Sequence, residues 1–200
     1  MQRRQFILSS TTLLAAGALI GTSALTGCTT TSPSSDASPS ANAGKRQTID
    51  AGADATLARL TESVHGSREL LAKAQGALVF PEVISAGFWV GGQYGQGALR
   101  IGGRTAGYYS IAAASFGPQI GAQSKAIVML FMTQEALSKF TSSQGWAAGV
   151  DATVAVLKIG ANGNVDTSTA TSPVEAFVLT NAGLMAGVSL EGSKISRLII

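Results

Sequence analysis

The chain has 200 residues, of which 46% are hydrophobic and 12% are charged, and it contains one Cys, one His and 24 glycines. This composition excludes a disulfide framework, which needs paired cysteines, and a structural zinc site, which needs about four Cys or His ligands. The apolar content is also too high for a disordered chain. The length and composition therefore predict one glycine-rich, weakly charged globular domain.

The formal net charge is +3, but two basic residues, Arg3 and Arg4, lie in a segment that we expect to be removed. Without them, 12 basic residues stand against 11 acidic ones. A nearly neutral domain offers no electrostatic reason to bind DNA or RNA, so we expect no nucleic-acid partner.

Residues 1–27 have the pattern of an export signal peptide. Arg3 and Arg4 precede an uncharged, mostly apolar stretch from Phe6 to Leu25, which is the order of a charged region and an apolar region in such signals. A membrane-spanning helix is the alternative, although Ser, Thr and Gly are frequent in the stretch. The arginine pair weakly resembles a twin-arginine signal, so the export route, general or twin-arginine, stays open.

The only Cys of the chain, Cys28, follows Leu25-Thr26-Gly27, and this segment resembles the lipobox of bacterial lipoproteins. In such proteins the signal is cut before the Cys, and the thiol and the new amine are acylated, for example with palmitate. Two or three acyl chains anchor a protein stably, whereas a buried Cys present by chance is the alternative. In the lipoproteins that this segment resembles, an Asp after the Cys favours retention in the inner membrane. Thr29 follows here, so the resemblance implies an exported protein anchored in the outer membrane, facing the periplasm or the cell surface.

Residues 29–48 are rich in Ser, Thr, Ala and Pro and contain no large apolar residue. Such a segment cannot bury a core. We therefore predict a flexible linker over residues 28–48, with the acylated Cys at its start, and a globular domain over residues 49–200.

Two helices are predicted at the start of this domain. Apolar residues at three- and four-residue steps predict the first over Ile49–His65. Gly66 suits the left-handed position that follows a helix. Ser67 is the expected N-cap of a second, short helix that ends near Ala74, and His65 is expected to be a solvated helix end.

From Gly76 onward, short β-prone segments separated by glycine predict strands, and Lys125–Met132 is the strongest candidate for a buried one. Thr133 is predicted to cap a further helix near residues 133–140. The other predicted strands are Ala77–Phe80, which would end at Pro81, and then Phe88–Tyr94, Ala98–Ile101, Tyr108–Phe116, Gly149–Ile159, Val174–Thr180, Leu184–Leu190 and Ile195–Ile200, with a hairpin turn at Asn162-Gly163.

These elements predict an α+β fold in which the N-terminal helices pack on a strongly curved, mostly antiparallel sheet or barrel of short, glycine-rich strands. A closed barrel and an open curved sheet both fit the pattern.

No motif supports an enzyme. The segment Gly91–Gly97 has neither the GxGxxG order of a dinucleotide site nor a P-loop ending, and tight packing of bent strands explains its glycines better. His65 is the only possible base of a catalytic triad and is expected on a polar helix end. Glu82 and Asp151 are candidate buried acids, although turn and surface roles are commoner. We therefore expect no enzymatic activity, no cofactor and no metal site.

Four basic residues are candidate ligands for lipid headgroups. Arg68 and Lys73 fall on the second predicted helix, and Arg100 and Arg104 flank Gly102-Gly103. If they converge in space, they would hold phosphate headgroups through charge-assisted hydrogen bonds. Ordinary solvated surface is the alternative interpretation.

Three segments, Gly76–Gly97, Gly117–Met132 and Gly183–Gly192, resemble successive signature segments of the SYLF-domain family, and the likeness covers about residues 60–195. The resemblance implies a lipid-binding module. Eukaryotic members bind phosphoinositides, partly through an amphipathic N-terminal segment, and some bind and bundle actin. The bacterial members that this chain resembles are exported lipoproteins.

Two positions depart from the family pattern. Gln93 stands where Glu is frequent, so no carboxylate role is expected there, and Trp89 stands where Gly is frequent. Trp89 would either add apolar surface at a membrane-facing rim or fill the core.

Together these observations predict a membrane-anchored bacterial lipoprotein whose domain binds lipid, with anionic phospholipid or phosphoinositide headgroups as the ligand. The alternative is a structural envelope protein that acts through protein–protein contacts without lipid specificity. Actin is expected as a partner only if the protein meets a host cell.

Overall fold

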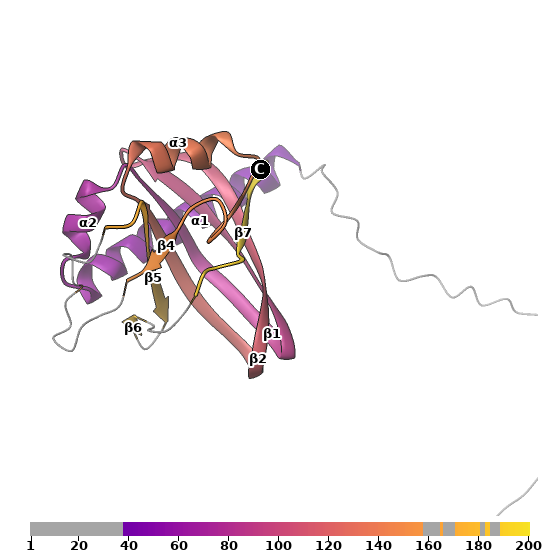
Figure 1. Cartoon of the computed structure of the whole chain (residues 1–200). Helices are drawn as coiled ribbons and strands as arrows, with labels where there is room; N and C mark the ends of the chain where they lie inside the picture. The colour runs from indigo at the N-terminus through magenta and orange to yellow at the C-terminus, as the bar shows by residue number, and fades with distance from the viewer. Residues whose placement is uncertain (1–37, 158–164, 166–170, 181–182, 185–188) are drawn as a thin grey trace, which may run out of the picture. The chain divides into compact units, whose positions relative to one another are not determined.

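Figure 1 shows the computed structural model, which describes residues 38–157, 165, 171–180, 183–184 and 189–200, with the backbone alone at 88–90, 115–122 and 183–184. These residues lie within one compact unit, Asp36–Ile200. They form three helices and seven strands, in the order α1 (Pro39–Ser63), α2 (Ser67–Lys73), β1 (Gly76–Ile101), β2 (Arg104–Phe131), α3 (Gln134–Ser142), β3 (Gly145–Ala147), β4 (Val154–Val156), β5 (Val174–Thr180), β6 (Gly183–Leu184) and β7 (Lys194–Leu198).

One long antiparallel hairpin, β1 with β2, organises the sheet. Its register begins with Gly76 opposite Phe131 and ends with Ile101 opposite Arg104. The turn is Gly102-Gly103, whose φ angles of +56° and +77° lie in the left-handed region that favours glycine.

The short strands predicted between residues 77 and 132 are therefore parts of two long strands. The breaks predicted inside β1 and β2 were wrong, whereas the predicted end at Ile101 is confirmed. Pro81 lies in a register shift between Phe80 and Val83, where its missing N–H removes no bond from a regular ladder. Glycine within a strand allows it to bend without ending it.

The glycine-rich part of β1 allows the strand to cross over itself. A Cβ atom on Gly97 would collide with the carbonyl oxygen of Val79, and one on Gly95 would lie 2.7 Å from the carbonyl oxygen of Glu82. Real Cβ atoms do not approach so closely, so the second half of β1 packs directly on the first half at these positions. The prediction that these glycines serve close packing of bent strands is confirmed.

The two ends of β2 take different neighbours. Residues 108–112 pair with β7, and residues 126–131 pair with β5, both antiparallel. Beyond them β3 pairs with β7, and β4 pairs in parallel with β5. Within the described residues the strand order is β3-β7-β2-β5-β4, and its two end strands do not pair with each other. The predicted α+β fold is confirmed, because most pairs are antiparallel and the sheet curves so strongly that β1 packs on itself.

The strands predicted after residue 132 are confirmed only in part. Val174–Thr180 is confirmed as β5, and Ile195–Ile200 corresponds to β7. Among the described residues of Gly149–Ile159, only β4 is a strand, and Gly149 adopts φ +85° in a turn. Leu184 lies in β6, while Ser189 and Leu190 lie outside any strand. The Asn162-Gly163 turn, the rest of these two segments and the side chain of Trp89 lie outside the described residues, and β3 was not predicted.

Helix α1 begins ten residues earlier than predicted. Ser38 is its N-cap and accepts a hydrogen bond from the Ala41 amide at 3.4 Å, and Pro39 occupies the first turn. The last residues of the predicted linker are therefore helical. They carry no apolar stripe, because most of their side chains are exposed, and so the periodicity first appears at Ile49.

The other two helices begin close to their predicted residues. Gly66 has the predicted left-handed conformation, with φ +85°. Ser67 was wrongly predicted as an N-cap, because it is the first residue of α2 and its buried hydroxyl donates to the carbonyls of Leu60 and Val64. Thr133 does cap α3, accepting from the Ala136 amide at 3.2 Å.

Alternating strand residues build two apolar clusters. The inner cluster contains Phe80 and Met129 and is closed by Phe140 of α3. The outer cluster contains Val128 and Phe177 and is covered by α1 and α2. None of the helices in the described part of the chain is both long and apolar enough to cross a bilayer.

Candidate functional site

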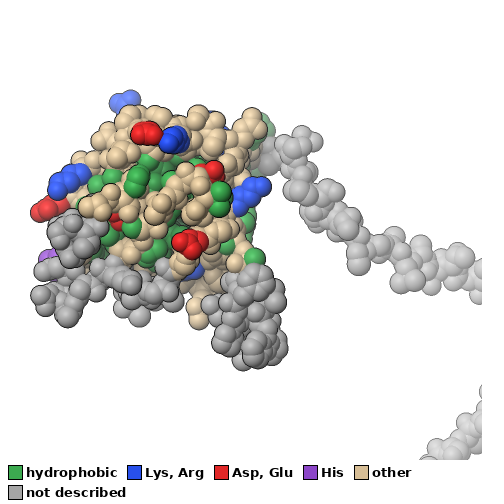
Figure 2. All heavy atoms as spheres, viewed as in Figure 1, with side chains coloured by type: hydrophobic (Ala, Val, Ile, Leu, Met, Phe, Trp, Pro, Cys, Tyr) green, Lys and Arg blue, Asp and Glu red, His purple; other side chains and the backbone are tan. Residues whose placement is uncertain are grey.

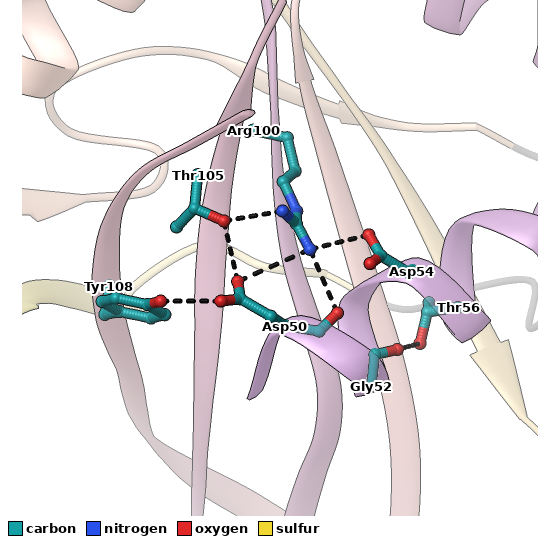
Figure 3. Close-up of polar contacts among 7 residues, drawn as sticks. All are labelled: Asp50, Gly52, Asp54, Thr56, Arg100, Thr105 and Tyr108. Atoms are coloured by element: carbon teal, nitrogen blue, oxygen red, sulfur yellow. Dashed lines mark hydrogen bonds and ion pairs between the residues drawn. The ribbon is translucent and has the colours of Figure 1, made fainter. Parts of the chain in front are cut away.

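A polar network joins α1 to the turn end of the β1–β2 hairpin (Figure 3). Nη2 of Arg100 lies 2.6 Å from Oδ1 of Asp54 and 3.5 Å from Oδ1 of Asp50, and it donates to the Asp50 carbonyl at 3.1 Å. Nη1 of the same guanidinium donates to the Thr105 hydroxyl at 2.6 Å. One arginine on β1 thus contacts two carboxylates on α1.

Asp50 is the acceptor at the centre of this network. Its Oδ1 accepts from the Thr105 hydroxyl and its Oδ2 from the Tyr108 hydroxyl, each at 2.7 Å. The pKa of Tyr108 is raised above its ordinary value, first by burial and then by the hydrogen bond to Asp50. Each oxygen of the Asp50 carboxylate therefore accepts a hydrogen bond from a neighbouring hydroxyl.

The Arg100 side chain is only 13% exposed, whereas the Asp54 side chain is 70% exposed. Nε of Arg100 is buried and has no hydrogen-bond partner among the described residues. Because Arg100 is held by two carboxylates of α1, it fixes the position of this helix on the sheet. Both of its terminal nitrogens already contact protein groups.

The four residues predicted to bind headgroups differ in exposure and in ion pairing. Arg100 faces α1 in the network, while Arg68, Lys73 and Arg104 are exposed and form no ion pair with any described residue. On the face shown in Figure 2, Lys and Arg side chains are scattered and do not form one patch.

Backbone packing nevertheless brings two of these elements together. The Cβ position of Gly76 lies 3.4 Å from the Arg100 carbonyl oxygen, so the start and the end of β1 meet. Lys73 ends α2 just before Gly76, and Arg104 begins β2 just after the hairpin turn. Both cations therefore lie at the same end of the sheet, with the exposed acid Glu69 on the same short helix.

The other candidate residues make ordinary surface contacts or lie outside the described residues. Glu82 is exposed and accepts from the Ser124 hydroxyl at 3.3 Å, and Asp151 accepts from the Ala147 amide at 2.6 Å in a turn. Neither is a buried acid. Cys28 lies outside the described residues, among which no group of His, Cys, Asp and Glu is placed to hold a metal ion.

The buried acid is Glu175 on β5, which is 0% exposed. Oε1 accepts from the Ser172 amide at 2.9 Å, and Oε2 has no partner among the described residues. Burial raises the pKa of this carboxyl. One acid inside the apolar run Val174–Thr180 was the signal that sequence reasoning overlooked.

An open pocket of about 470 Å³ lies beside the network. It is lined by Gly107 and Tyr108 of β2 and by Arg197, Leu198, Ile199 and Ile200 of β7 and the residues after it. Arg46 of α1 reaches the same region, because its Nη1 donates to a main-chain oxygen of Ile200 at 2.6 Å. No motif links residues 46, 108 and 197, so sequence reasoning missed this juxtaposition.

Comparison with known proteins finds a family match over part of the chain. Residues 112–198, from the middle of β2 to the end of β7, match the family model described as Ysc84, Las17-binding protein actin regulator. The chain is also 33% identical over 129 residues to SH3 domain-containing YSC84-like protein 1 of Xenopus laevis, an alignment that covers 62% of this chain and 38% of that relative. The chain thus spans about two fifths of the relative's length. The resemblance predicted from three segments is confirmed: residues 112–198 match the Ysc84, or SYLF, family model, and the chain is similar to a YSC84-like protein.

Proposed function

We propose that this chain is a lipid-anchored envelope protein whose domain binds the headgroups of anionic phospholipids or phosphoinositides. The observation that carries the proposal is the pair of exposed cations, Lys73 and Arg104, at the end of the sheet where β1 meets itself. Arg68 on the same short helix adds a third cation. Surface cations of this kind attract anionic lipid by about 1 kcal/mol each.

Arg100 takes a supporting role in this proposal. Its guanidinium is bound to Asp50 and Asp54, so it positions the hairpin turn that carries Arg104 and leaves headgroup contact to its neighbours.

The proposed acyl anchor on Cys28 makes weak headgroup binding sufficient. Ser38, the N-cap of α1, follows Cys28 by ten positions, and such a chain reaches at most about 35 Å. A domain held this close to a bilayer meets its lipids at a high effective concentration. The location that follows is an exported protein anchored in the outer membrane.

The proposed activity is binding and not catalysis. The matched family is described as an actin regulator and the relative as SH3 domain-containing. For this chain we propose actin as a partner only where the exported protein meets a host cell.

Vesicle sedimentation tests the proposal. The protein beginning at Thr29 contains the whole compact unit Asp36–Ile200 and should pellet with phosphatidylglycerol vesicles more than with phosphatidylcholine vesicles. Added salt should reduce this binding, because exposed charges are screened. Lys73→Gln with Arg104→Gln should weaken it, whereas Lys139→Gln on α3 is the matched control. Equal pelleting with both vesicle types would contradict the proposal.

A specific observation also favours the alternative of an envelope protein that contacts other proteins. No charged residue lies between Glu82 and Arg100 or between Arg104 and Lys125. Within these stretches Ile84 is 50% exposed and Tyr94 is 51% exposed. Uncharged, partly apolar surface of this kind is typical of contact sites. Cross-linking in intact cells that captures one dominant protein partner, and loses it in Ile84→Asp, would support this alternative.

A further inference from the structure

We propose that residues 83–87 of β1 are the contact surface for a second copy of this chain, and that the two copies pair edge to edge along this segment in an antiparallel, two-fold arrangement. The inference goes beyond the proposed lipid binding and does not depend on it. Lys73 and Arg104 lie beside the two ends of β1, whereas this segment lies inside the strand.

One edge of this segment is free within the described part of the chain. β1 pairs only with β2 among the described strands, and in an antiparallel pair alternate residues turn their N–H and C=O groups away from the partner strand. The register with β2 is regular from Val83 to Phe88, between two register shifts. The crossing of β1 over itself involves the carbonyls of Val79 and Glu82, which precede the segment. Residues 83–87 therefore present a regular edge to which another strand can be added.

The helical cover of β1 ends just before this segment. The Cβ position of Gly52 on α1 lies 3.0 Å from Pro81, so the helix packs on β1 at that point. Beyond it Ile84 is 50% exposed, and Ala86 is exposed as well. Alternation along the strand places both side chains on one face. Figure 1 shows β1 and β2 continuing together beyond the helices, so an apolar strip adjoins the free edge.

The charge pattern favours a second copy as the partner. Natural edge strands are usually protected by charged residues or proline, yet Val83–Leu99 contains neither, and no charged residue lies between Arg104 and Lys125 on the neighbouring strand. A charged partner strand would meet no opposite charge here. The same segment of a second copy brings no charge to be desolvated and no like charge to be repelled.

The segment is also complementary to itself. In a two-fold interface the same surface contacts itself. With the axis at Ser85, Ile84 of each copy lies opposite Ala86 of the other, so a large side chain meets a small one twice. Glu82 stays outside the paired segment at both ends. The two Glu82 carboxylates are then about 20 Å apart along the strands, which exceeds the screening length of about 10 Å.

Sedimentation over a concentration series tests the inference on the protein beginning at Thr29, which contains the compact unit Asp36–Ile200. We expect an equilibrium between monomer and dimer. Ile84→Asp should raise the dissociation constant of the dimer about a hundredfold, a factor of about ten for each of the two charges buried. Val150→Asp is the matched control, because Val150 is 80% exposed in the turn after β3, and it should dimerise like the wild type.

Disulfide formation tests the two-fold register. The protein beginning at Thr29 contains no cysteine, so introduced thiols report on the contact alone. An equimolar mixture of Ile84→Cys and Ala86→Cys should form linked dimers several times faster than either variant by itself. Only in the mixture do two cysteines lie directly opposite each other, at a separation that suits a disulfide.

Several results would overturn the proposal. A wild type that stays monomeric up to millimolar concentration, or equal dimerisation by Ile84→Asp and Val150→Asp, excludes this edge as a contact between copies. Equal linking rates in the mixture and in the single variants exclude the register. A monomeric wild type that is cross-linked in cells to a different protein, with the link lost in Ile84→Asp, assigns the surface to that protein.

Two controls keep these outcomes interpretable. Thermal melting of each variant excludes misfolding as the cause of a lost dimer. Vesicle sedimentation separates this inference from the proposed function, because Ile84→Asp retains Lys73 and Arg104 and should still pellet with phosphatidylglycerol vesicles. Conversely, Lys73→Gln with Arg104→Gln should still dimerise, and loss of the dimer in that variant would contradict pairing through residues 83–87.

Discussion

The helix α1 is held to the sheet in two ways along its length. In its first half and at its centre, polar contacts run from Arg46 to Ile200 and from Asp50 and Asp54 to Arg100, beside the buried Ile49 and Ala53. Its second half buries Leu60 in the outer apolar cluster, which Val64 joins just after the helix, and forms no ion pair among the described residues. The comparison teaches that a helix can have one end fixed by burial alone, which tolerates salt and pH, and the other by burial together with charge, whose electrostatic part does not.

The largest effect is expected in the apolar half. Leu60 is 0% exposed, so Leu60→Ala should lower the free energy of unfolding by about 3 kcal/mol through lost burial and a cavity. Leu57→Ala, one turn away and only half-buried, is the matched control and should cost clearly less. Urea unfolding followed by circular dichroism measures both, and equal losses would contradict the assignment of the cluster.

Removal of the central carboxylate should produce the next largest effect. Asp50→Ala leaves Arg100 with one carboxylate partner, the exposed Asp54, and leaves the hydroxyls of Thr105 and Tyr108 without the Asp50 acceptor. We expect a loss of about 2 kcal/mol, because a partly buried charge loses its compensation. The loss should shrink at high salt, unlike that of Leu60→Ala. A loss that does not depend on salt would show that the first half of α1 is not held by charge.

The apolar half also rests on a cluster with one titratable neighbour. Alternation along β5 places Glu175 on the same face as Phe177 and Leu179 of the outer cluster. Its folded-state pKa is raised by burial, so the folded protein holds this proton more tightly than the unfolded chain does. Its contribution to stability is therefore present at acidic pH and is lost as pH rises through the raised pKa.

Glu175→Gln should flatten this dependence. Unfolding free energies of the wild type should fall relative to those of Glu175→Gln as pH rises above the ordinary glutamate range. Parallel curves for the two proteins would mean that the carboxyl does not titrate differently in the folded state.

The smallest effect is expected at the exposed end of the network. Asp54 is 2.6 Å from Arg100 but 70% exposed, and exposed ion pairs contribute less than about 1 kcal/mol. Asp54→Ala should cost less than about 0.5 kcal/mol and serves as the matched comparison for Asp50→Ala. Thermal melting at two salt concentrations resolves the pair. A loss as large as that of Asp50→Ala would show that Asp54 shares the central role.

Local patterns predicted the parts of the fold that depend on neighbouring residues. The Thr133 cap, the apolar stripe of α1 and the run of β5 are all visible within a few residues of sequence. The continuity of β1 and β2 was not visible, because glycine was interpreted as the end of a strand. In the structure the same residue type allows a strand to bend and to pack on its own backbone.

The candidate site was predicted only in part. Arg100 was predicted as a headgroup ligand, whereas its guanidinium contacts Asp50 and Asp54 of α1, which lie about fifty positions earlier in the chain. Arg46 and Arg197 were missed, because no spacing rule connects a helix with a strand so distant in sequence. Tertiary contacts of this kind depend on how the sheet curls, which periodicity does not encode.

The long hairpin has a consequence for the order in which the chain assembles. β1 and β2 are adjacent in sequence and are joined by a two-residue turn at Gly102-Gly103. Their pairing therefore requires little loss of chain entropy for closing the loop. β5 and β7 must return from much farther along the chain to reach the two ends of β2. We therefore expect the hairpin to form first and to act as the template on which β5, β7 and the helices condense.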